Sequence, residues 1–484
     1  LTKSGSGTWT LSGAGLYSGA TTISAGTLKL GAMGAIPDSS SVTVTGTLDL
    51  NGKAETVAGI SGTGRITSSA AGTPVLTIGG NNASTSFSGQ IENGIATSVG
   101  ITKIGSGVLT LSGTNTFTGP VIVNGGGLTL ANRAIVAPMC QYSANQGQAT
   151  DWHLMHWGNL LNSGAGLFII EATAVEPEGR ITPYCLGLWD DKTEAALKDR
   201  LQRARALAPQ VPVCIQLAHA GRKASSDAPW KGGQLLDAQQ GGWQTVGPSA
   251  IPQLDGEVAP QELDATGLER IKQAFVKAAQ RSQALGIEAI EIHNAHGYLL
   301  HQFLSPIANQ RSDQYGGSLE NRMRYPLEVF QALRSAFSGV LGVRVSASDW
   351  LDNGLQLEEV IEFAKQLKAL GCDFIHVSSG GISPKQQIAI GPNYQVPFAK
   401  AIKAATGMTT IAVGLITEAK QAEAILQADE ADAIAMARAF LYQPRWVWQA
   451  AAELGGQVAA SEQYWRCMPR QAQHIFGQVK LGQR

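Results

Sequence analysis

The stretch LGVRVSASDWLDNGLQLEEVIEFAKQLKALGCDFIHVSSGG (residues 341–381) shows how most of this chain folds. The apolar run at 341–347 predicts a buried strand, and the run at 374–381 predicts a second one. Between them, apolar residues recur at the spacing of one helix face, and Gly371 marks the end of that helix. The residues of this face are Leu357, Val360, Ile361, Ala364 and Leu367. The segment therefore predicts a strand, a helix and a second strand.

Strands and helices alternate in this way from about residue 130 to the C-terminal region. Helical patterns such as the one at 268–285 separate eight short β-rich runs. The runs are 135–139, 166–175, 211–219, 289–293, 341–347, 374–381, 409–414 and 433–438. Eight strands with intervening helices over about 350 residues predict an α/β fold of the (β/α)₈ TIM-barrel type.

The first 130 residues follow a different pattern. Residues 1–30, LTKSGSGTWTLSGAGLYSGATTISAGTLKL, return at 101–130 as ITKIGSGVLTLSGTNTFTGPVIVNGGGLTL. Between them, SVTVTGTLDL (41–50) alternates apolar and polar residues and is expected to form one strand with an apolar face. Short alternating strands separated by Gly, Ser and Asn turns predict an all-β, β-helix-like solenoid. The repeat resembles the passenger repeats of bacterial autotransporters, which are exported surface proteins.

Charge and cysteine content exclude several classes of protein. Of the 36 basic and 37 acidic residues only nine lie in residues 1–132, and the net charge is −1 without a basic block, which argues against nucleic-acid binding. No apolar run approaches the ~18–20 residues of a membrane span. The five cysteines are widely spaced, so neither a metal site nor a disulfide framework is expected. These features predict a reduced, cytoplasmic barrel, whereas the repeats suggest an exported protein.

The residues that follow the predicted strands indicate where chemistry takes place. In barrels of this type the active site lies at the carboxyl ends of the strands. Here these ends collect polar, imidazole, thiol and guanidinium groups. They are APMCQY (137–142), EAT (171–173), QLAH (216–219), HNAHGY (293–298), Arg344, SSGG (378–381), Gly414 and Ala437-Arg438.

These motifs resemble the Old Yellow Enzyme family. The resemblance covers about residue 128 to the C-terminus, and the combination of a cysteine with two histidines is similar to the bacterial xenobiotic reductases and NADPH dehydrogenases. It implies non-covalent FMN, NADPH or NADH as reductant, and reduction of activated C=C bonds in enones and enals. The matching stretches are APMCQYSA (137–144), EATAV (171–175), QLAHAGRKAS (216–225), HNAHGYLLHQFLSP (293–306) and RSDQYGGSLENRMRY (311–325).

The resemblance assigns catalytic roles to three residues of one segment. His293 and His296 would hydrogen-bond the substrate carbonyl oxygen, where charge develops as hydride passes from flavin N5 to Cβ. Tyr298 would deliver a proton to Cα, since a phenol with a pKa of ~10 is protonated at neutral pH. A single His-x-x-His after a strand is more often structural. The adjacent tyrosine and the other polar strand ends favour function here.

The resemblance also implies an FMN site. Arg344 would face the N1/O2 edge of the flavin, where a permanent cation stabilises the anionic reduced form; the alternative is a structural ion pair with Glu291 or Asp349. Gln216 would hydrogen-bond the pyrimidine edge. The family's backbone lines FMN at the positions of Ala137, Pro138, Met139, Cys140 and Ala172.

The FMN phosphate is expected after the seventh and eighth strands, at Gly414, Ala437 and Arg438. The family more often has Gly-Arg where this chain has Ala437-Arg438. The alanine keeps the backbone N–H but adds a side chain that crowds the approach of a phosphate. We therefore expect the chain to bind FMN, at worst with a lower affinity than family members that have glycine at this position.

Three further residues complete the predicted site. The thiol of Cys140 would tune the flavin potential, although most isolated cysteines are small buried apolar residues. Tyr142 would hydrogen-bond the substrate, the alternative being packing at the barrel rim. Arg466, in QYWR (463–466), resembles an arginine that enters a neighbouring subunit's site, which implies a homo-oligomer.

The junction of the two regions is expected after residue 127, giving a repeat region at 1–127 and a barrel domain at 128–484. Residues 120–126 are expected to imitate a hairpin that plugs the barrel bottom in relatives. Deletion of residues 1–116 should then leave the barrel stable, and deletion of 1–127 should destabilise it. The alternative to an ene-reductase is an exported structural or adhesive solenoid joined to a non-functional or artefactually fused barrel.

Overall fold

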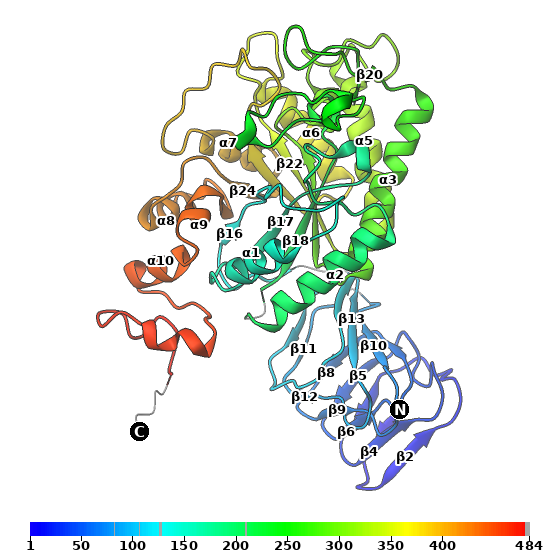
Figure 1. Ribbon diagram of the computed structural model, residues 1–484. Helices are drawn as coiled ribbons and strands as arrows, with labels where there is room; N and C mark the ends of the chain where they lie inside the picture. Colours follow the sequence, from blue (N-terminus) through cyan, green and yellow to red (C-terminus); the bar gives the residue numbers. More distant parts are fainter. Residues whose placement is uncertain (82, 106, 125–127, 209–210, 480–484) are drawn as a thin grey trace. The chain divides into compact units, whose positions relative to one another are not determined.

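The protein is described by a computed structural model that covers residues 1–484 except 82, 106, 125–127, 209–210 and 480–484 (Figure 1). The chain forms two compact units, one made chiefly of Leu1–Thr129 and the other chiefly of Leu130–Arg484. The boundary predicted after residue 127 lies next to residues outside the described ones. It stays a prediction.

The second unit is a closed barrel of eight strands, which confirms the predicted (β/α)₈ fold (Figure 1). The strands follow one another around the barrel in chain order, and β25 pairs with β16 to close it. They are β16 (Ala134–Val136), β17 (Leu167–Ala174), β18 (Val213–Ala218), β21 (Ala289–Asn294), β22 (Val340–Ser346), β23 (Phe374–Ser378), β24 (Thr409–Ala412) and β25 (Ala433–Met436). Each coincides with one of the eight predicted runs.

Helices between the strands cover the outside of the barrel. The predicted helix at 357–370 is α6, and Gly371 follows it with a φ of +84°, a left-handed conformation that favours glycine. The predicted helix at 268–285 is α3, which begins after Asp264, whose carboxylate accepts from the Gly267 N–H at 2.7 Å. The helices are α1 (Asp151–Leu161), α2 (Asp191–Ala206), α3 (Ala265–Ala284), α4 (Leu299–Leu304), α5 (Leu319–Ala336), α6 (Leu357–Ala369), α7 (Val396–Thr406), α8 (Ala419–Gln427), α9 (Arg438–Tyr442) and α10 (Trp446–Leu454).

The first unit is a β-solenoid, as predicted. Every strand pairing recorded in it is parallel, and strands about one coil apart in sequence stack; Thr22, for example, pairs with Thr2 and with Thr43. The sheets have the strand orders β1-β3-β5-β8, β15-β13-β10-β7, β12-β9-β6-β4-β2 and β11-β14. The strands are β1 (Thr2–Lys3), β2 (Thr8–Leu11), β3 (Thr21–Ile23), β4 (Thr27–Leu30), β5 (Ser41–Val44), β6 (Thr47–Asp49), β7 (Glu55–Val57), β8 (Gly59–Ser61), β9 (Arg65–Thr67), β10 (Val75–Ile78), β11 (Thr85–Phe87), β12 (Gln90–Ile91), β13 (Gly100–Ile104), β14 (Leu109–Leu111) and β15 (Val121–Asn124).

One local prediction for the solenoid is wrong, and a second falls partly outside the described residues. Residues 41–50 form two strands, β5 and β6, that belong to different sheets, because the chain turns between them at Gly46. A side chain at Gly46 would lie 2.6 Å from the Gly26 carbonyl oxygen of the coil below, so the corner requires glycine. The hairpin expected at 120–126 is not formed by residues 121–124, which pair as β15 in parallel with β13. Residues 125–126 lie outside the described residues.

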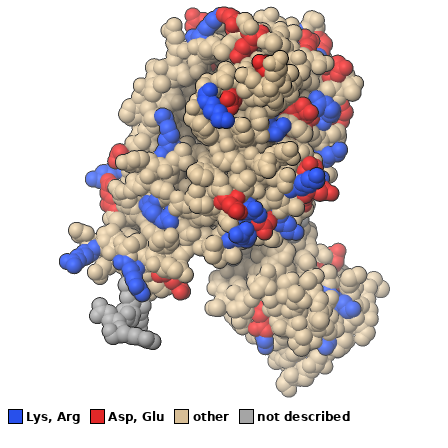
Figure 2. Space-filling view, in the orientation of Figure 1, with Lys and Arg blue, Asp and Glu red and all other residues tan. Residues whose placement is uncertain are grey.

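The two units differ in surface charge, as their composition requires. Figure 2 shows few charged side chains on the solenoid unit and many of both signs, intermixed, on the barrel unit. Within the described parts of the chain, no helix is long and apolar enough to cross a membrane.

Candidate active site

The strands of the barrel bring almost all predicted site residues to one rim, the carboxyl ends of the strands. The segment after β16 carries Ala137 to Cys140 and Tyr142, and β21 ends in the HNAHGY segment. The remaining positions are Ala172 on β17, Gln216 on β18, Arg344 on β22, Gly414 after β24, and Ala437 and Arg438 after β25. Residues far apart in sequence thus share one end of the barrel.

His293, His296 and Tyr298 form a cluster of rings. The centroid of the His293 ring lies 5.2 Å from that of His296 and 4.8 Å from that of Tyr298, and both pairs meet edge to face. His296 has a φ of +59°, a left-handed conformation that is uncommon for a residue with a side chain. This turn folds the segment back after β21 and brings the three side chains together.

Both imidazoles are neutral in this environment. Burial, followed by the positive charge of Arg344, holds the pKa of His293 and of His296 well below its usual range. The Ala295 N–H donates to Nδ1 of His293 at 3.3 Å, so the proton of that ring lies on Nε2. His293 therefore presents an uncharged N–H donor.

His296 is held by serines that the sequence analysis did not single out. Its backbone N–H donates to Oγ of Ser346 at 2.9 Å, and its Nε2 lies 2.8 Å from Oγ of Ser378. Oε1 of Gln395 accepts from Ser379 at 2.6 Å and, at 3.3 Å from the Ser378 hydroxyl, is a second acceptor for the proton of that hydroxyl. When the Ser378 hydroxyl donates to Nε2 of His296 instead, the ring proton lies on Nδ1, and that N–H is available to a ligand. The Ser-Ser pair after β23 was visible in the sequence, but its contact with His296 depends on the alignment of two separate strands.

Tyr298 is a protonated phenol beside a half-buried cation. Burial raises the pKa of Tyr298 well above its usual value, so the hydroxyl keeps its proton at neutral pH. Lys223 lies with Nζ 5.2 Å from the centroid of the Tyr298 ring. The Lys223 ammonium also donates to the backbone carbonyls of His296 at 2.8 Å and Gly381 at 3.0 Å. Lys223 is a site residue that sequence reasoning missed, although it lies within the QLAHAGRKAS motif.

The loop that carries Cys140 and Tyr142 is fixed from below by a buried carboxylate. Oε2 of Glu171 accepts from the Gln141 N–H at 2.8 Å, and Oε1 lies 3.4 Å from Nε2 of the fully buried His153. Tyr142 has a φ of +49°, and its ring meets that of Trp230 edge to face at 5.7 Å. Burial, then the nearby Cys185 and Glu171, raise the pKa of the Cys140 thiol well above its usual value. Cys140 is therefore a thiol rather than a thiolate.

Strand β17 carries an irregularity at the predicted cofactor position. Ile170 pairs with Ile215 and Thr173 with Leu217, so the register between β17 and β18 shifts across Glu171 and Ala172. Such a bulge releases backbone groups from the ladder and is frequent beside active sites. The backbone of Ala172 is thereby available to a ligand at the rim.

Four polar side chains occupy the barrel interior just below this rim. Arg344 is 7% exposed, and its Nε has no hydrogen-bond partner within the described residues. The expected alternative, a structural ion pair with Glu291 or Asp349, is absent among the described residues. Glu291 instead lies 2.7 Å from Nδ1 of His376 and accepts from Gln216 at 2.6 Å.

The loops after β24 and β25 contain the residues predicted for phosphate. Gly414 has a φ of +124°, and a side chain there would lie 3.0 Å from Nε2 of Gln395. Ala437 immediately precedes α9, and Arg438 is exposed at its start. Both loops therefore present backbone and one guanidinium at the rim.

Arg466 is the predicted site residue that the structure does not bring to this rim. It is exposed in the 3₁₀ segment η5 (Glu462–Cys467), and Ser461 just before η5 donates to Asn162 at the C-terminal end of α1. Because α1 runs opposite to the strands, that end lies at the amino side of the barrel. Arg466 therefore stays a prediction for a neighbouring subunit.

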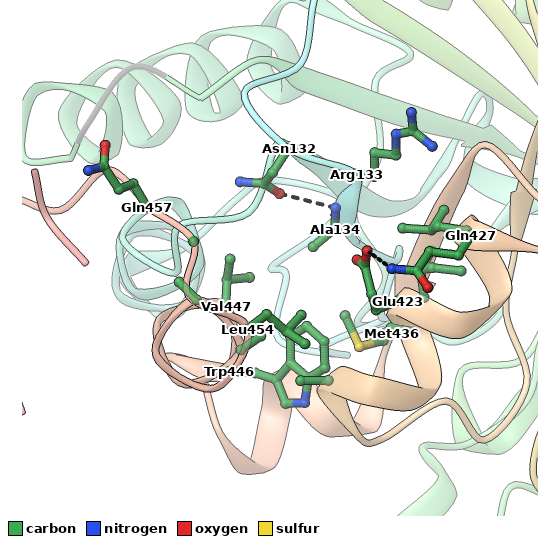
Figure 3. A pocket seen from close by; sticks show the side chains of 17 residues that line it. Asn132, Arg133, Ala134, Glu423, Gln427, Met436, Trp446, Val447, Leu454 and Gln457 are labelled. Carbon is green, nitrogen blue, oxygen red and sulfur yellow. Dashed lines mark hydrogen bonds between the residues drawn. The ribbon is translucent and has the colours of Figure 1, made fainter. Parts of the chain in front are cut away.

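A separate pocket of about 420 Å³ lies near the amino end of β16, and Figure 3 shows its lining. Its walls are largely apolar, with Trp446, Val447 and Leu454 from α10 and Met436 from β25. The stability of the barrel, rather than its chemistry, depends on this end of the fold. We place the active site at the opposite rim.

Comparison with known proteins identifies the family of the chain. Residues 120–457 match the NADH:flavin oxidoreductase / NADH oxidase family. The chain is 41% identical to an NADPH dehydrogenase from Geobacillus sp. (strain WCH70), over 70% of this chain and 95% of that protein. It is 43% identical to an NADH:flavin oxidoreductase from Gibberella zeae, over 74% of this chain and 90% of that protein.

Further matches concern the fold of the barrel and the repeats. Morphinone reductase, solved in complex with tetrahydroNAD, superposes with a TM-score of 0.55 at 27% identity, over 69% of this chain and 90% of that one. Residues 1–30 and 101–130 match the passenger-associated-transport-repeat, in agreement with the resemblance to autotransporter passengers. The chain therefore belongs to the NADH:flavin oxidoreductase / NADH oxidase family, the Old Yellow Enzyme family, and is an FMN-dependent oxidoreductase with NADH or NADPH as its reductant.

Proposed function

We propose that the barrel reduces activated C=C bonds of α,β-unsaturated carbonyl compounds. The observation that carries this proposal is the ring cluster of His293, His296 and Tyr298. It combines two uncharged imidazoles with a protonated phenol, close enough together for one small ligand to touch all three. Reduction of an enone needs donors at the carbonyl oxygen and a proton at Cα, and this cluster contains both.

The residues at the rim fit FMN. A buried guanidinium with an unpartnered Nε suits an anionic ring edge, and Arg344 provides one. Nε2 of Gln216 is engaged by Glu291, so its Oε1 remains as an acceptor for an N–H of the ring. The backbone of Ala172, the loop at Gly414, and Ala437-Arg438 complete the set of candidate contacts. When bound, FMN supplies the transfer of hydride between NAD(P)H and an acceptor.

The protein's own side chains would then act on the substrate. The N–H groups of His293 and His296 donate to the carbonyl oxygen and stabilise the negative charge that develops there, each worth ~2.7–4 kcal/mol by analogy with other oxyanion donors. The Tyr298 hydroxyl transfers its proton to Cα. Tyr142 and Cys140 border the same space as neutral groups, and the protonated thiol of Cys140 does not act as a nucleophile.

For the assembled protein we propose a homo-oligomer in which Arg466 enters the site of a neighbouring subunit. The exposure of Arg466 at the amino side of its own barrel supports a role toward another chain.

For the solenoid unit we propose a structural role. Residues 1–129 contain no histidine and only four carboxylates, Asp38, Asp49, Glu55 and Glu92. The match to a passenger-associated repeat supports a surface-exposed origin for this unit.

Isotope labelling tests the proposed reaction. With cyclohexenone and NADPH deuterated at the transferred C4 position, we expect cyclohexanone that carries deuterium at Cβ. In D₂O with unlabelled NADPH, deuterium should appear at Cα instead. Formation of the allylic alcohol, with the C=C bond intact, would show that the carbonyl group is the acceptor and would overturn the proposal.

A further inference from the structure

The interior of the barrel contains one layer that is polar rather than apolar. Gln216 on β18, Glu291 on β21, Arg344 on β22 and His376 on β23 come from four neighbouring strands. Gln216 is paired in register with Glu291, and Arg344 with His376. Their exposed fractions are 2%, 0%, 7% and 0%, respectively. Barrel layers are ordinarily filled by branched apolar side chains, so the polar composition of this layer requires an explanation.

The carboxylate of Glu291 is the centre of the layer. Oε2 lies 2.7 Å from Nδ1 of His376, and Oε1 accepts from Nε2 of Gln216 at 2.6 Å. Burial raises the pKa of Glu291, but the neighbouring His376 and Arg344 outweigh it and the pKa is lowered overall. Burial and Arg344 lower the pKa of His376. The pair is thus a carboxylate and a neutral imidazole whose Nδ1–H donates to it.

This arrangement keeps Glu291 away from the nearest guanidinium. An ionised carboxylate and an arginine in one buried layer would ordinarily form an ion pair. Here both carboxylate oxygens are occupied by neutral donors, and Nε of Arg344 is left without a partner within the described residues. The amide of Gln216 is also fixed, with its N–H₂ toward Glu291 and its oxygen without a hydrogen-bond partner among the described residues.

We propose that Glu291 and His376 are positioning residues that hold Arg344 and Gln216 ready for the flavin and set its reduction potential. The inference rests on the proposed FMN site. His376 occupies the carboxylate and so leaves the guanidinium available to the ring edge. The negative charge of Glu291 opposes the anionic reduced form and moderates the effect of Arg344. Glu291 itself therefore lowers the reduction potential of the flavin, whereas His376 raises it by keeping Arg344 available.

Midpoint potentials of the FMN-loaded protein test this inference. Glu291→Gln removes the opposing charge, so we expect a more positive midpoint potential. The expected shift is at least about 30 mV, which corresponds to a tenfold change in a two-electron equilibrium. His376→Phe removes the donor and frees Glu291 to pair with Arg344, so we expect a more negative potential. FMN affinity, measured by fluorescence quenching with apoprotein, should fall about tenfold or more in both variants.

A matched control separates this role from buried pairing in general. Glu176 is a buried carboxylate that lies 2.9 Å from Nε2 of the buried His219, outside the polar layer. Glu176→Gln removes the same charge and should leave the potential unchanged. If Glu291→Gln does not fold, Glu291→Asp is the substitute variant. Because it keeps the charge, its potential should stay near the wild-type value, while its FMN binding should be weaker.

The outcomes distinguish this inference from the proposed function. Unchanged potentials in both Glu291→Gln and His376→Phe, with FMN bound, would overturn it, as would shifts of the same sign. Opposite shifts in a protein that does not reduce enones would support the inference and reject only the proposed substrate. A wild-type protein that binds no FMN would overturn both.

Discussion

At the scale of single residues, Tyr298 tests the assignment of the proton donor. Tyr298→Phe keeps the ring that packs against His293 but removes the hydroxyl. We expect the rate of enone reduction to fall by about 10²–10⁴, the usual contribution of a positioned acid, while bleaching of the flavin absorbance by NADPH is unchanged. Stopped-flow absorbance measures both. Tyr315→Phe, outside the ring cluster, is the control, and equal enone rates in the two variants would exclude the role.

Lys223 predicts a pH dependence. Burial, with a contribution from Arg222, lowers the pKa of Lys223 to about 8, so the ammonium is charged below that pH and neutral above it. The charged form holds the carbonyls of His296 and Gly381. Turnover with an enone should therefore fall as pH rises through about 8. Lys223→Met should be slower and lack this decline. The same decline in wild type and variant would assign it to another group.

Sequence reasoning found most residues of the rim but not the residues that hold them in position. His293, His296 and Tyr298 are recognisable because they lie within six positions of one strand end. Ser378, Glu171 and Lys223 act through contacts between different strands or loops, and no local pattern predicts which strand faces which. The role of Arg466 depends on a second chain, so neither the sequence nor one protomer tests it.

At the scale of elements, the loop after β24 has a strict requirement for glycine. Gly414→Ala would place Cβ 3.0 Å from the Gln395 amide at a φ of +124°. Strain of about 1–3 kcal/mol is expected, and displacement of the loop should weaken FMN binding about fivefold to 150-fold. Gly391→Ala is the control, because nothing lies within 4 Å of its Cβ position. Titration of apoprotein with FMN measures both; equal affinities would remove this loop from the site.

The elements themselves were well predicted where their patterns are long. All eight barrel runs overlap strands, although several predicted runs extend into the rim loops, as at Ser379-Gly380-Gly381 after β23 and at His219 after β18. The prediction for residues 41–50 failed for a different reason. The alternation of apolar residues continues through the corner at Gly46, since both strands face the same solenoid interior.

At the scale of the whole molecule, the chain has two separate apolar cores. One core lies within residues 23–101 and the other within residues 136–475. Calorimetry should therefore show two unfolding transitions. FMN should raise the midpoint temperature of only one of them, because a ligand stabilises the unit that binds it. A truncation that starts at residue 128 should retain that transition. A single transition in the intact chain would contradict independent cores.

This expectation differs from the one drawn from the sequence of the junction. Because residues 121–124 pair with β13, we expect deletion of 1–116 and of 1–127 to leave equal activity; a loss of stability in the second deletion alone would support the plug instead. The sequence alone suggested a hairpin because the residues of the last coil suit either arrangement.

The most direct test of the whole account is the visible absorption spectrum of the purified protein under anaerobic conditions. We predict a flavin spectrum that bleaches when NADPH is added and returns when cyclohexenone is added. Bleaching without return would retain the flavoprotein and reject the proposed substrate class. A protein that is colourless, and stays colourless after incubation with FMN, would contradict the account, and the exported solenoid would then be the better description of this chain.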